Sequence, residues 1–338
     1  MKIAIANDSR IAIEALRRAL LTNNNYQLLW VAQTGAEAIK CCAQQCPDLL
    51  LMDMHMPNLN GVEATRQIMQ QSPCTILIVT ASITRHSAMV FEAMSYGALD
   101  VVKTPPLGID NPEAANILLK KMSILTKSRL SAIDPLCQKS PSIPQKRADA
   151  NDNQLPKLIV IGASTGGPGA LQSILSQLPD NLDAAIIVVQ HIDEQFAPSL
   201  AHWLNQSSKL PVARVRNGDR PKIGEVLLAG GNQHLIMRPN GSLRYTHKPV
   251  DYPHRPSVDI FFHSVANHWG KPGVAILLTG MGKDGALGLG HLHSEQWHTI
   301  AESETSCVVF GMPKAAIATG AAKQILALNQ ITAYLTGS

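Results

Sequence analysis

Apolar runs alternate with segments of helical periodicity over roughly the first 125 residues. Because a strand covered on both faces carries few polar residues, we interpret the runs as buried strands. They span residues 3–6, 28–32, 49–52, 76–79 and 99–102. Between them, residues 10–21, 62–69 and 87–96 place apolar side chains on one face at helical spacing. This alternation predicts a parallel sheet with helices on both faces.

The pattern stops between about residues 127 and 156, where Ser, Pro, Asn and Gln dominate, as is typical of a linker. A second alternating block follows, with its clearest strands at residues 157–161, 185–189, 226–229 and 274–279. We therefore expect one α/β domain over residues 1–125, a flexible linker over 126–156 and a second, loop-rich α/β domain over 157–338.

Composition narrows the class of protein. The chain has 338 residues, of which 45% are hydrophobic and 16% charged, enough for two globular cores and too apolar for disorder. The net charge of +4 is small and its Lys and Arg residues are scattered, so we expect no nucleic-acid partner. The six cysteines show no C-x-x-C spacing, which argues against zinc and disulfides. No apolar run suits a signal peptide or membrane insertion, and we expect a cytoplasmic protein.

Polar side chains stand at the strand ends of the first half. Asp8 follows the first strand, Asp53 ends the third, Thr80 ends the fourth and Lys103 ends the fifth. The carboxyl ends of parallel strands share one edge, so these groups can converge on one pocket. Two carboxylates suit Mg²⁺, and the metal with a lysine neutralises a phosphoryl group during its transfer to Asp53. Thr80 would then bind the phosphorylated Asp53 and move a loop.

This half resembles the response-regulator receiver family. The matching positions are Asn7-Asp8-Ser9, Met52-Asp53 with Met56-Pro57 and Gly61, and Ile78-Val79-Thr80-Ala81. The resemblance implies a flavodoxin-like fold with a five-stranded parallel sheet, Asp53 as phosphoacceptor, and Mg²⁺ held by Asp8, Asp53 and the backbone carbonyl of His55. Asn7 stands where an acid is usual, and Lys103 is one place away from the position directly before Pro. Solvated loop acids, or a receiver that is phosphorylated poorly, are the alternatives.

In the second half, Gly162-Ala163-Ser164-Thr165-Gly166 lies between an apolar strand and an expected helix. Such a turn exposes a nucleophilic serine beside free helix amides, but it equally suits a nucleotide phosphate. His191 and Asp284 favour the hydrolase, because each follows another strand and would join Ser164 at one sheet edge. His191 would take the serine proton, and Asp284 would orient the imidazole.

The order of these residues along the chain, Ser then His then Asp, differs from that of α/β-hydrolases and disfavours that fold. Asp284, which precedes Gly285, is alternatively an ordinary turn-forming residue without a catalytic role. No comparable strand-end position points to a catalytic role for the other histidines, among them His234, His254, His263 and His291.

The second half resembles the CheB protein-glutamate methylesterases of bacterial chemotaxis. The matching blocks are residues 161–168, Gln190-His191, residues 255–259, residues 278–282 with 284–286, and residues 309–313. The resemblance implies a doubly wound α/β domain, Ser164 as nucleophile, His191 as general base and acid, and Asp284 as its partner. It further implies Met281 as an oxyanion donor through its backbone N–H, Thr165 as a positioning residue, and no metal in the esterase reaction.

By this resemblance the reaction is hydrolysis of glutamate methyl esters on methyl-accepting chemoreceptors, with glutamine deamidation in some members. A CheA-type histidine kinase supplies the phosphoryl group, and the unphosphorylated receiver covers the catalytic cleft. Residues 96–102 with Thr104-Pro105 are similar to the Wsp-type surface-sensing branch. A non-catalytic signalling adaptor and a general small-ester hydrolase are the competing functions.

Overall fold

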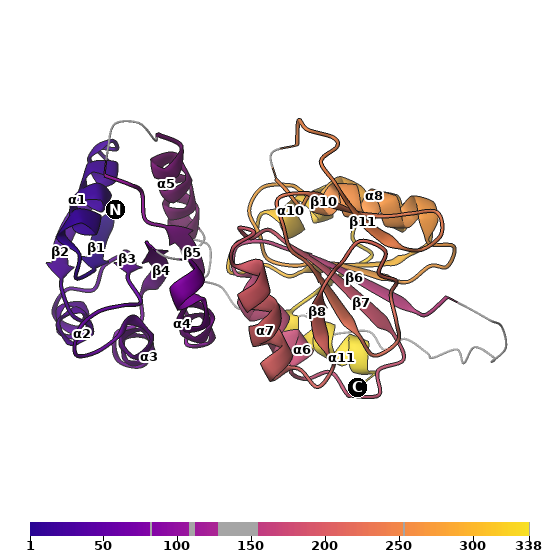
Figure 1. The fold of residues 1–338 in the computed structure, drawn as a ribbon, viewed down its shortest axis with the longest axis horizontal. Coiled ribbons are helices and arrows are strands. Elements are labelled where there is room, and N and C mark those ends of the chain that lie inside the picture. Colours follow the sequence, from indigo (N-terminus) through magenta and orange to yellow (C-terminus); the bar gives the residue numbers. More distant parts are fainter. Residues whose placement is uncertain (82, 108–111, 128–154, 253, 338) are drawn as a thin grey trace.

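The computed structural model describes residues 1–81, 83–107, 112–127, 155–252 and 254–337, which form two α/β domains (Figure 1). Most of the expected linker, residues 128–154, lies outside the described residues. Among the described helices, none has the length and apolar character needed to cross a membrane.

The N-terminal domain is a five-stranded parallel sheet in the order β2-β1-β3-β4-β5. Its strands are β1 (Lys2–Ala6), β2 (Gln27–Ala32), β3 (Leu49–Met52), β4 (Thr75–Thr80) and β5 (Asp100–Lys103). Its helices are α1 (Arg10–Leu21), α2 (Gly35–Gln44), α3 (Gly61–Gln71), α4 (Ile83–Ser95) and α5 (Pro112–Lys127). All five predicted strands are present within a residue or so of their expected bounds, whereas the sequence analysis did not single out α2 and α5.

Side-chain caps fix where the first three helices begin. The side chains of Ser9, Thr34 and Asn60 accept hydrogen bonds from backbone N–H groups in the first turns of α1, α2 and α3. Gly61 at the start of α3 is required by close packing, because a Cβ there would lie 2.0 Å from the carbonyl oxygen of Asp53. The start of α3 is thereby held directly against the end of β3.

The C-terminal domain is built on a seven-stranded sheet in the order β14-β13-β12-β6-β7-β9-β8, whose neighbouring strands all pair in parallel. The strands are β6 (Leu158–Ala163), β7 (Ala185–Gln190), β8 (Val212–Arg214), β9 (Val226–Ala229), β12 (Val274–Leu277), β13 (His298–Glu302) and β14 (Gln324–Leu326). A separate antiparallel hairpin pairs β10 (His234–Met237) with β11 (Leu243–Thr246).

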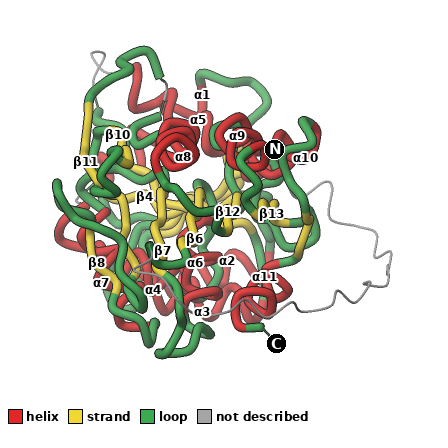
Figure 2. Tube along the Cα trace, turned by 90° about the vertical axis from the view of Figure 1, so that its right-hand side faces the viewer, coloured by secondary structure: helices red, strands yellow, loops and turns green. Residues whose placement is uncertain are grey.

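Helices cover both faces of this sheet, as expected for a doubly wound domain. They are α6 (Gly167–Leu175), α7 (Ala197–Ser207), α8 (Val258–His268), α9 (Ala286–Ser294), α10 (Met312–Ala318) and α11 (Leu328–Thr336). Figure 2 shows α8, α9 and α10 above the strands and α6, α7 and α11 below them. The strand order reverses between β6 and β12, which is the position where doubly wound sheets bind their ligands.

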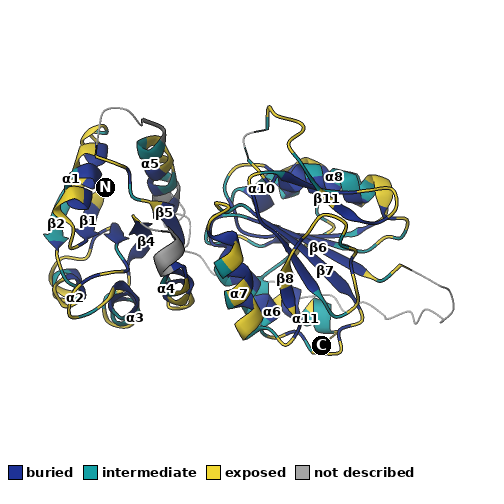
Figure 3. Ribbon diagram, viewed as in Figure 1, coloured by how far each residue is buried: buried dark blue, intermediate teal, exposed yellow. Residues whose placement is uncertain are grey.

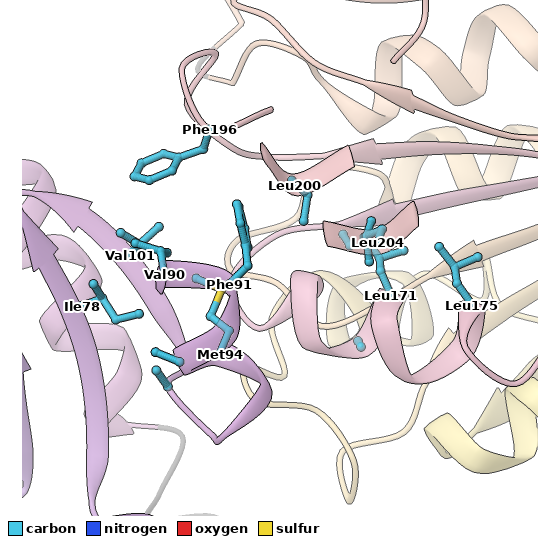
Figure 4. Close-up of a cluster of buried hydrophobic side chains, with 14 of the residues drawn as sticks. Ile78, Val90, Phe91, Met94, Val101, Leu171, Leu175, Phe196, Leu200 and Leu204 are labelled. Atoms are coloured by element: carbon cyan, nitrogen blue, oxygen red, sulfur yellow. The ribbon is translucent and has the colours of Figure 1, made fainter. Parts of the chain in front are cut away.

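The central strands of both sheets are buried, and exposed residues gather on the outer helix faces and loops (Figure 3). The apolar core continues across the domain boundary, where α4 packs against α6 and α7 (Figure 4). Phe91 on α4 is fully buried there, between side chains of the N-terminal domain and the leucines of α6 and α7. The two domains therefore share a packed apolar interface.

Candidate active site

Ser164 follows the last residue of β6, between the ends of β7 and β12. Its N–H donates to the carbonyl oxygen of Thr279 at 3.0 Å, and its own carbonyl accepts from Nε2 of Gln190 at 2.8 Å. Gly166 makes the sharp turn into α6 with a φ of 80°, a left-handed conformation that favours glycine. Ser164 is half-buried at the switch point of the sheet, as the sequence predicts.

His191 occupies the matching place after β7, where its N–H donates to the carbonyl oxygen of Ala163 at 3.0 Å. Its ring Nε2 lies 2.7 Å from Oδ2 of Asp284, and the two side chains are only 9% and 7% exposed. The other ring nitrogen, Nδ1, is buried without a hydrogen-bond partner in the described parts of the chain. The structure thus joins His191 to Asp284, while no hydrogen bond joins His191 to Ser164 among the described residues.

Asp284 is held by the start of α8 as well as by His191. Oδ1 accepts from Ser257 Oγ at 2.8 Å and from the N–H of Asp259 at 3.1 Å, and Oδ2 accepts from the N–H of Val258 at 2.7 Å. Burial alone would raise the pKa of Asp284, but the hydrogen bonds from His191, Val258 and Ser257 outweigh burial and hold that pKa well below its usual range.

The ionised state of Asp284 fixes the tautomer of the neutral His191 ring. A carboxylate without a proton only accepts, so Nε2 of His191 carries the proton in this pair. Nδ1 is then the basic atom of the imidazole and is free to accept a proton. This is the arrangement that a general base for a serine requires.

Two supports of Asp284 were not predicted from the sequence. Ser257 is the N-cap of α8 and donates to the carboxylate through its hydroxyl. His234, fully buried on β10, accepts from the N–H of Ser257 through Nδ1 at 3.2 Å, and its Nε2 lies 3.0 Å from the carbonyl oxygen of Pro249. Residues 255–259 were recognised as a block, and a serine before a helical segment was the available signal for a cap.

The glycine turn after β12 lies against Ser164. A Cβ on Gly280 would come within 2.8 Å of the Cβ of Ser164 and 2.3 Å of the Sδ of Met312, so only glycine fits. The Gly280 carbonyl accepts from the N–H of Met312 at 2.8 Å, and the N–H of Met281, which belongs to the same trans peptide, therefore points in the opposite direction. In the described structure, the N–H of Met281 donates to no protein acceptor, as an oxyanion donor requires.

Thr165 supports this same turn. Its carbonyl oxygen accepts from Thr279 Oγ1 at 3.0 Å, and the residue is 9% exposed. Within the described parts of the chain, no hydrogen bond joins the Thr165 side chain to His191, so its positioning role there stays a prediction. Glu302, fully buried on β13, accepts from the N–H of Thr279 at 2.8 Å and so anchors the glycine turn after β12.

In the N-terminal domain, Asp53 follows β3 and donates its N–H to the Ala6 carbonyl at the end of β1. The pKa of Asp53 is raised to about 6 by burial together with the charge of Asp8, against the opposing N–H groups of Met54 and His55. Asn7 is buried, and its Oδ1 accepts from the N–H of Ser9 at 2.9 Å.

The expected metal ligands fit a divalent cation in charge. The negative charges of Asp8 and Asp53 repel each other, and a bound cation would relieve this repulsion. The His55 carbonyl lies two residues after Asp53 along the chain. No group of three or more His, Cys, Asp or Glu residues gathers at one point within the described residues, in keeping with the neutral Asn7 in place of an acid.

Thr80 and Lys103 lie opposite each other at the ends of β4 and β5. Thr80 is 1% exposed, whereas Lys103 is exposed. Among the described residues, Lys103 forms no ion pair with Asp8 or Asp53. The structure brings Lys103 to the predicted edge of the sheet, and its role as a partner of the phosphoryl group stays a prediction.

A cavity of about 430 Å³ lies between the domains and reaches the candidate active site. Lys103 and Lys121 line it from the N-terminal domain, and His191, Phe196 and His254 line it from the C-terminal domain. The N-terminal domain therefore forms one wall of the space beside the His191 ring.

Comparison with known proteins agrees with this two-domain organisation. Residues 159–335 match the CheB methylesterase family, and residues 3–106 match the response regulator receiver domain. The crystal structure of the Thermotoga maritima CheB methylesterase catalytic domain is similar at 37% identity with a TM-score of 0.52, covering 54% of this chain and 99% of that one.

Relatives of known function match the whole chain. Protein-glutamate methylesterase/protein-glutamine glutaminase 3 of Pseudomonas aeruginosa is 49% identical over 336 residues, which covers 99% of this chain and 98% of the relative. The corresponding protein 4 of Burkholderia thailandensis is 47% identical over 339 residues, covering 99% and 96%. The chain belongs to the CheB family of methylesterases that carry a response-regulator receiver domain.

Proposed function

We propose that this protein is a phosphorylation-controlled serine esterase that hydrolyses glutamate methyl esters on methyl-accepting chemoreceptors and deamidates receptor glutamines. The family and the names of the relatives support both reactions. The observation that carries the proposal is the bond between His191 Nε2 and Asp284, which leaves the basic Nδ1 buried at the strand end next to Ser164.

The proposed mechanism begins with Ser164. Nδ1 of His191 removes the hydroxyl proton as Oγ attacks the ester carbonyl, and Asp284 stabilises the imidazolium that forms. The N–H of Met281 donates to the oxyanion. His191 then returns the proton to the leaving methoxide, methanol departs, and water attacks the acyl-enzyme with His191 again as base. A glutamine follows the same route and releases ammonia.

The receiver would supply the control. Asp53 is the phosphoacceptor, and Asp8, Asp53 and the His55 carbonyl would hold Mg²⁺, which neutralises charge on the transferring phosphoryl group. Thr80 and Lys103 would respond to the phosphorylated state from the ends of β4 and β5. We expect a CheA-type histidine kinase as phosphodonor, and a substrate on cytoplasmic receptor helices, which would place the protein in the cytoplasm.

The contact between the domains supports inhibition by the unphosphorylated receiver. Met281 packs against the buried cluster that contains Leu118 and Met122 of α5, and Val309 belongs to that cluster. The receiver therefore lies against the turn that carries the proposed oxyanion donor. Separation of the domains would open the space beside Ser164 and His191 to a receptor helix.

Methanol release from methylated receptor tests the proposal. The parent protein should release methanol, and Ser164→Ala should lower the rate by about 10³- to 10⁶-fold, the scale of removing a member of such a triad. The matched control is Ser173→Ala. Ser173 is a serine of α6 that is half-buried like Ser164, and its variant should retain the parental rate.

Two outcomes would favour the other functions. Receptor binding without methanol release by the parent protein would favour a signalling adaptor. Faster turnover of simple soluble esters than of receptor would favour a general esterase, and equal release by the parent and Ser164→Ala would refute the nucleophile.

A further inference from the structure

We propose that His254 is a positioning residue of this active site, whose ring packs flat on the His191 imidazole and holds Nδ1 toward Ser164. The inference rests on the proposed role of His191 as the base for Ser164. It concerns a histidine that the strand pattern of the sequence does not single out.

The two rings are stacked. Their centroids are 4.5 Å apart and their planes are inclined by 16°. This is within the range of offset-stacked aromatic pairs. His254 forms no hydrogen bond with Ser164 or Asp284 in the described structure, so it acts on His191 through ring contact and not as a second base.

The ring of His191 needs such a contact. Its only hydrogen bond in the described structure is the one from Nε2 to Asp284, and Nδ1 has no partner there. The covalent Cβ–Cγ bond and this one hydrogen bond hold the ring at two points and leave it free to rock about the line between them. A flat neighbour restricts the turning and so fixes the direction in which Nδ1 points.

The same short segment supports both members of the pair. His254 lies three residues before Ser257, in the connection between β11 and α8. Ser257 and Val258 donate to Asp284, and His254 covers the His191 ring. The start of α8 therefore aligns the carboxylate and the imidazole together.

The charge of His254 suits this place. Burial lowers its pKa, the neighbouring His191 and Lys120 of α5 lower it further, and Asp284 opposes them. The other charged groups that line the adjoining cavity are Lys103, Lys121, Arg255, Asp100 and Asp193. A neutral His254 offers a ring face to the His191 imidazolium without adding a second positive charge beside it.

The rate at which a fluorophosphonate labels Ser164 tests the inference without using the receptor. In this reaction the serine oxygen bonds to phosphorus, fluoride leaves, and His191 takes the serine proton. The full chain is labelled with Mg²⁺ and acetyl phosphate present. His254→Ala should lower the labelling rate constant about tenfold. His254→Phe, which keeps a flat ring, should stay within about threefold of the parent.

The matched control is His247→Ala, an exposed histidine in the same connection, which should label at the parental rate. Trp203 of α7 stacks on Phe91 of α4 across the domain boundary. Repeating the series in a Trp203→Ala background, which removes this contact, separates an effect on the ring from an effect on domain closure. Steady-state methanol release should show the same loss in kcat for His254→Ala, with KM within about twofold.

A parental labelling rate in His254→Ala would overturn the inference, as would an equal loss in the Ala and Phe variants. No labelling of the parent would overturn both this inference and the nucleophile. Labelling of the parent that depends on His254, with no methanol released from receptor, would refute the proposed substrate and leave the positioning role supported.

Discussion

Phe91 of the receiver stacks on Trp203 of the catalytic domain, with ring centroids 5.5 Å apart and planes inclined by 25°. Phe196 meets the same phenylalanine edge-on at 6.4 Å. Ser87 and Ser199 add a hydrogen bond of 2.5 Å between α4 and α7. These contacts join α4 to α7 around the fully buried Phe91, as the proposed closed form requires.

Trp203→Ala should raise the basal esterase activity of the unphosphorylated protein. Trp203 is half-buried on the surface of α7, so its loss removes contact with Phe91 more than it disturbs the catalytic core. An interface weakened by about 1.4 kcal/mol shifts a closed-to-open equilibrium about tenfold, and we expect an increase of up to that scale. Methanol release without phosphodonor measures it.

Trp30→Ala is the control for this change. Trp30 is half-buried on β2, where its Nε1 donates to the carbonyl oxygen of Gln45, away from the domain boundary. It should leave basal activity unchanged per folded molecule. Equal basal rates in the Trp203 variant and the parent would show that the contact does not inhibit the enzyme.

Asp53→Asn should abolish acyl-phosphate labelling and the activation that depends on it. The amide cannot form the acyl phosphate, while its oxygen can still accept from the N–H of Met54 at this half-buried position. Labelling with a radioactive small phosphodonor in Mg²⁺ checks this result. Asp48→Asn, an exposed acid of the same domain, should label normally. Persistent labelling of the Asp53 variant would move the acceptor to another residue.

Much of this architecture follows from the strand pattern. The buried strands are apolar throughout, so the five strands of the first domain and β6, β7, β9 and β12 of the second were readable, whereas β8, β10, β11, β13 and β14 were not. Parallel pairing then placed Asp53, Ser164 and His191 at strand ends. Asp284 was reached the same way from β12. What lies at one edge of a parallel sheet is thus predictable once the strands are known.

The supports of the site were not predictable in this way. Ser257, His234 and His254 approach from the hairpin and the connection before α8, whose path depends on tertiary packing and not on strand periodicity. The exposure of Lys103 at the end of β5 likewise depends on the local course of the chain. The sequence pattern located the candidate catalytic groups, and only the fold shows what holds them.

Asp284→Asn should lower kcat by about 10³- to 10⁴-fold with a smaller change in KM. If the amide oxygen keeps the hydrogen bonds from Ser257 and Asp259, its NH₂ group faces the N–H of Val258 and Nε2 of His191. An NH₂ group cannot accept the His191 N–H, so the correct tautomer is lost. Steady-state methanol release and a thermal melt measure the effect on catalysis and on folding. Asp183→Asn, which pairs with Lys157 at the opposite edge of the sheet, should retain parental activity. A folded Asp284 variant with a parental kcat would exclude Asp284 from the mechanism.

Asp259→Asn should reduce the loss of stability that the parent shows as pH rises. Asp259 is 4% exposed, and burial with the neighbouring Asp284 charge raises its pKa to about 6, against the N–H of Gly288. A folded-state pKa above the unfolded value gives stability that is present below about pH 4 and lost as pH rises through 6. The two proteins should therefore be similar near pH 4, and the variant should be more stable at pH 7.5, by up to roughly 3 kcal/mol. Urea unfolding followed by tryptophan fluorescence at several pH values measures this difference, and Asp48→Asn serves as the exposed control. Parallel curves of unfolding free energy against pH for the parent and the Asp259 variant between pH 4 and 7.5 would contradict the prediction. They would show that Asp259 has the same pKa in the folded and unfolded states.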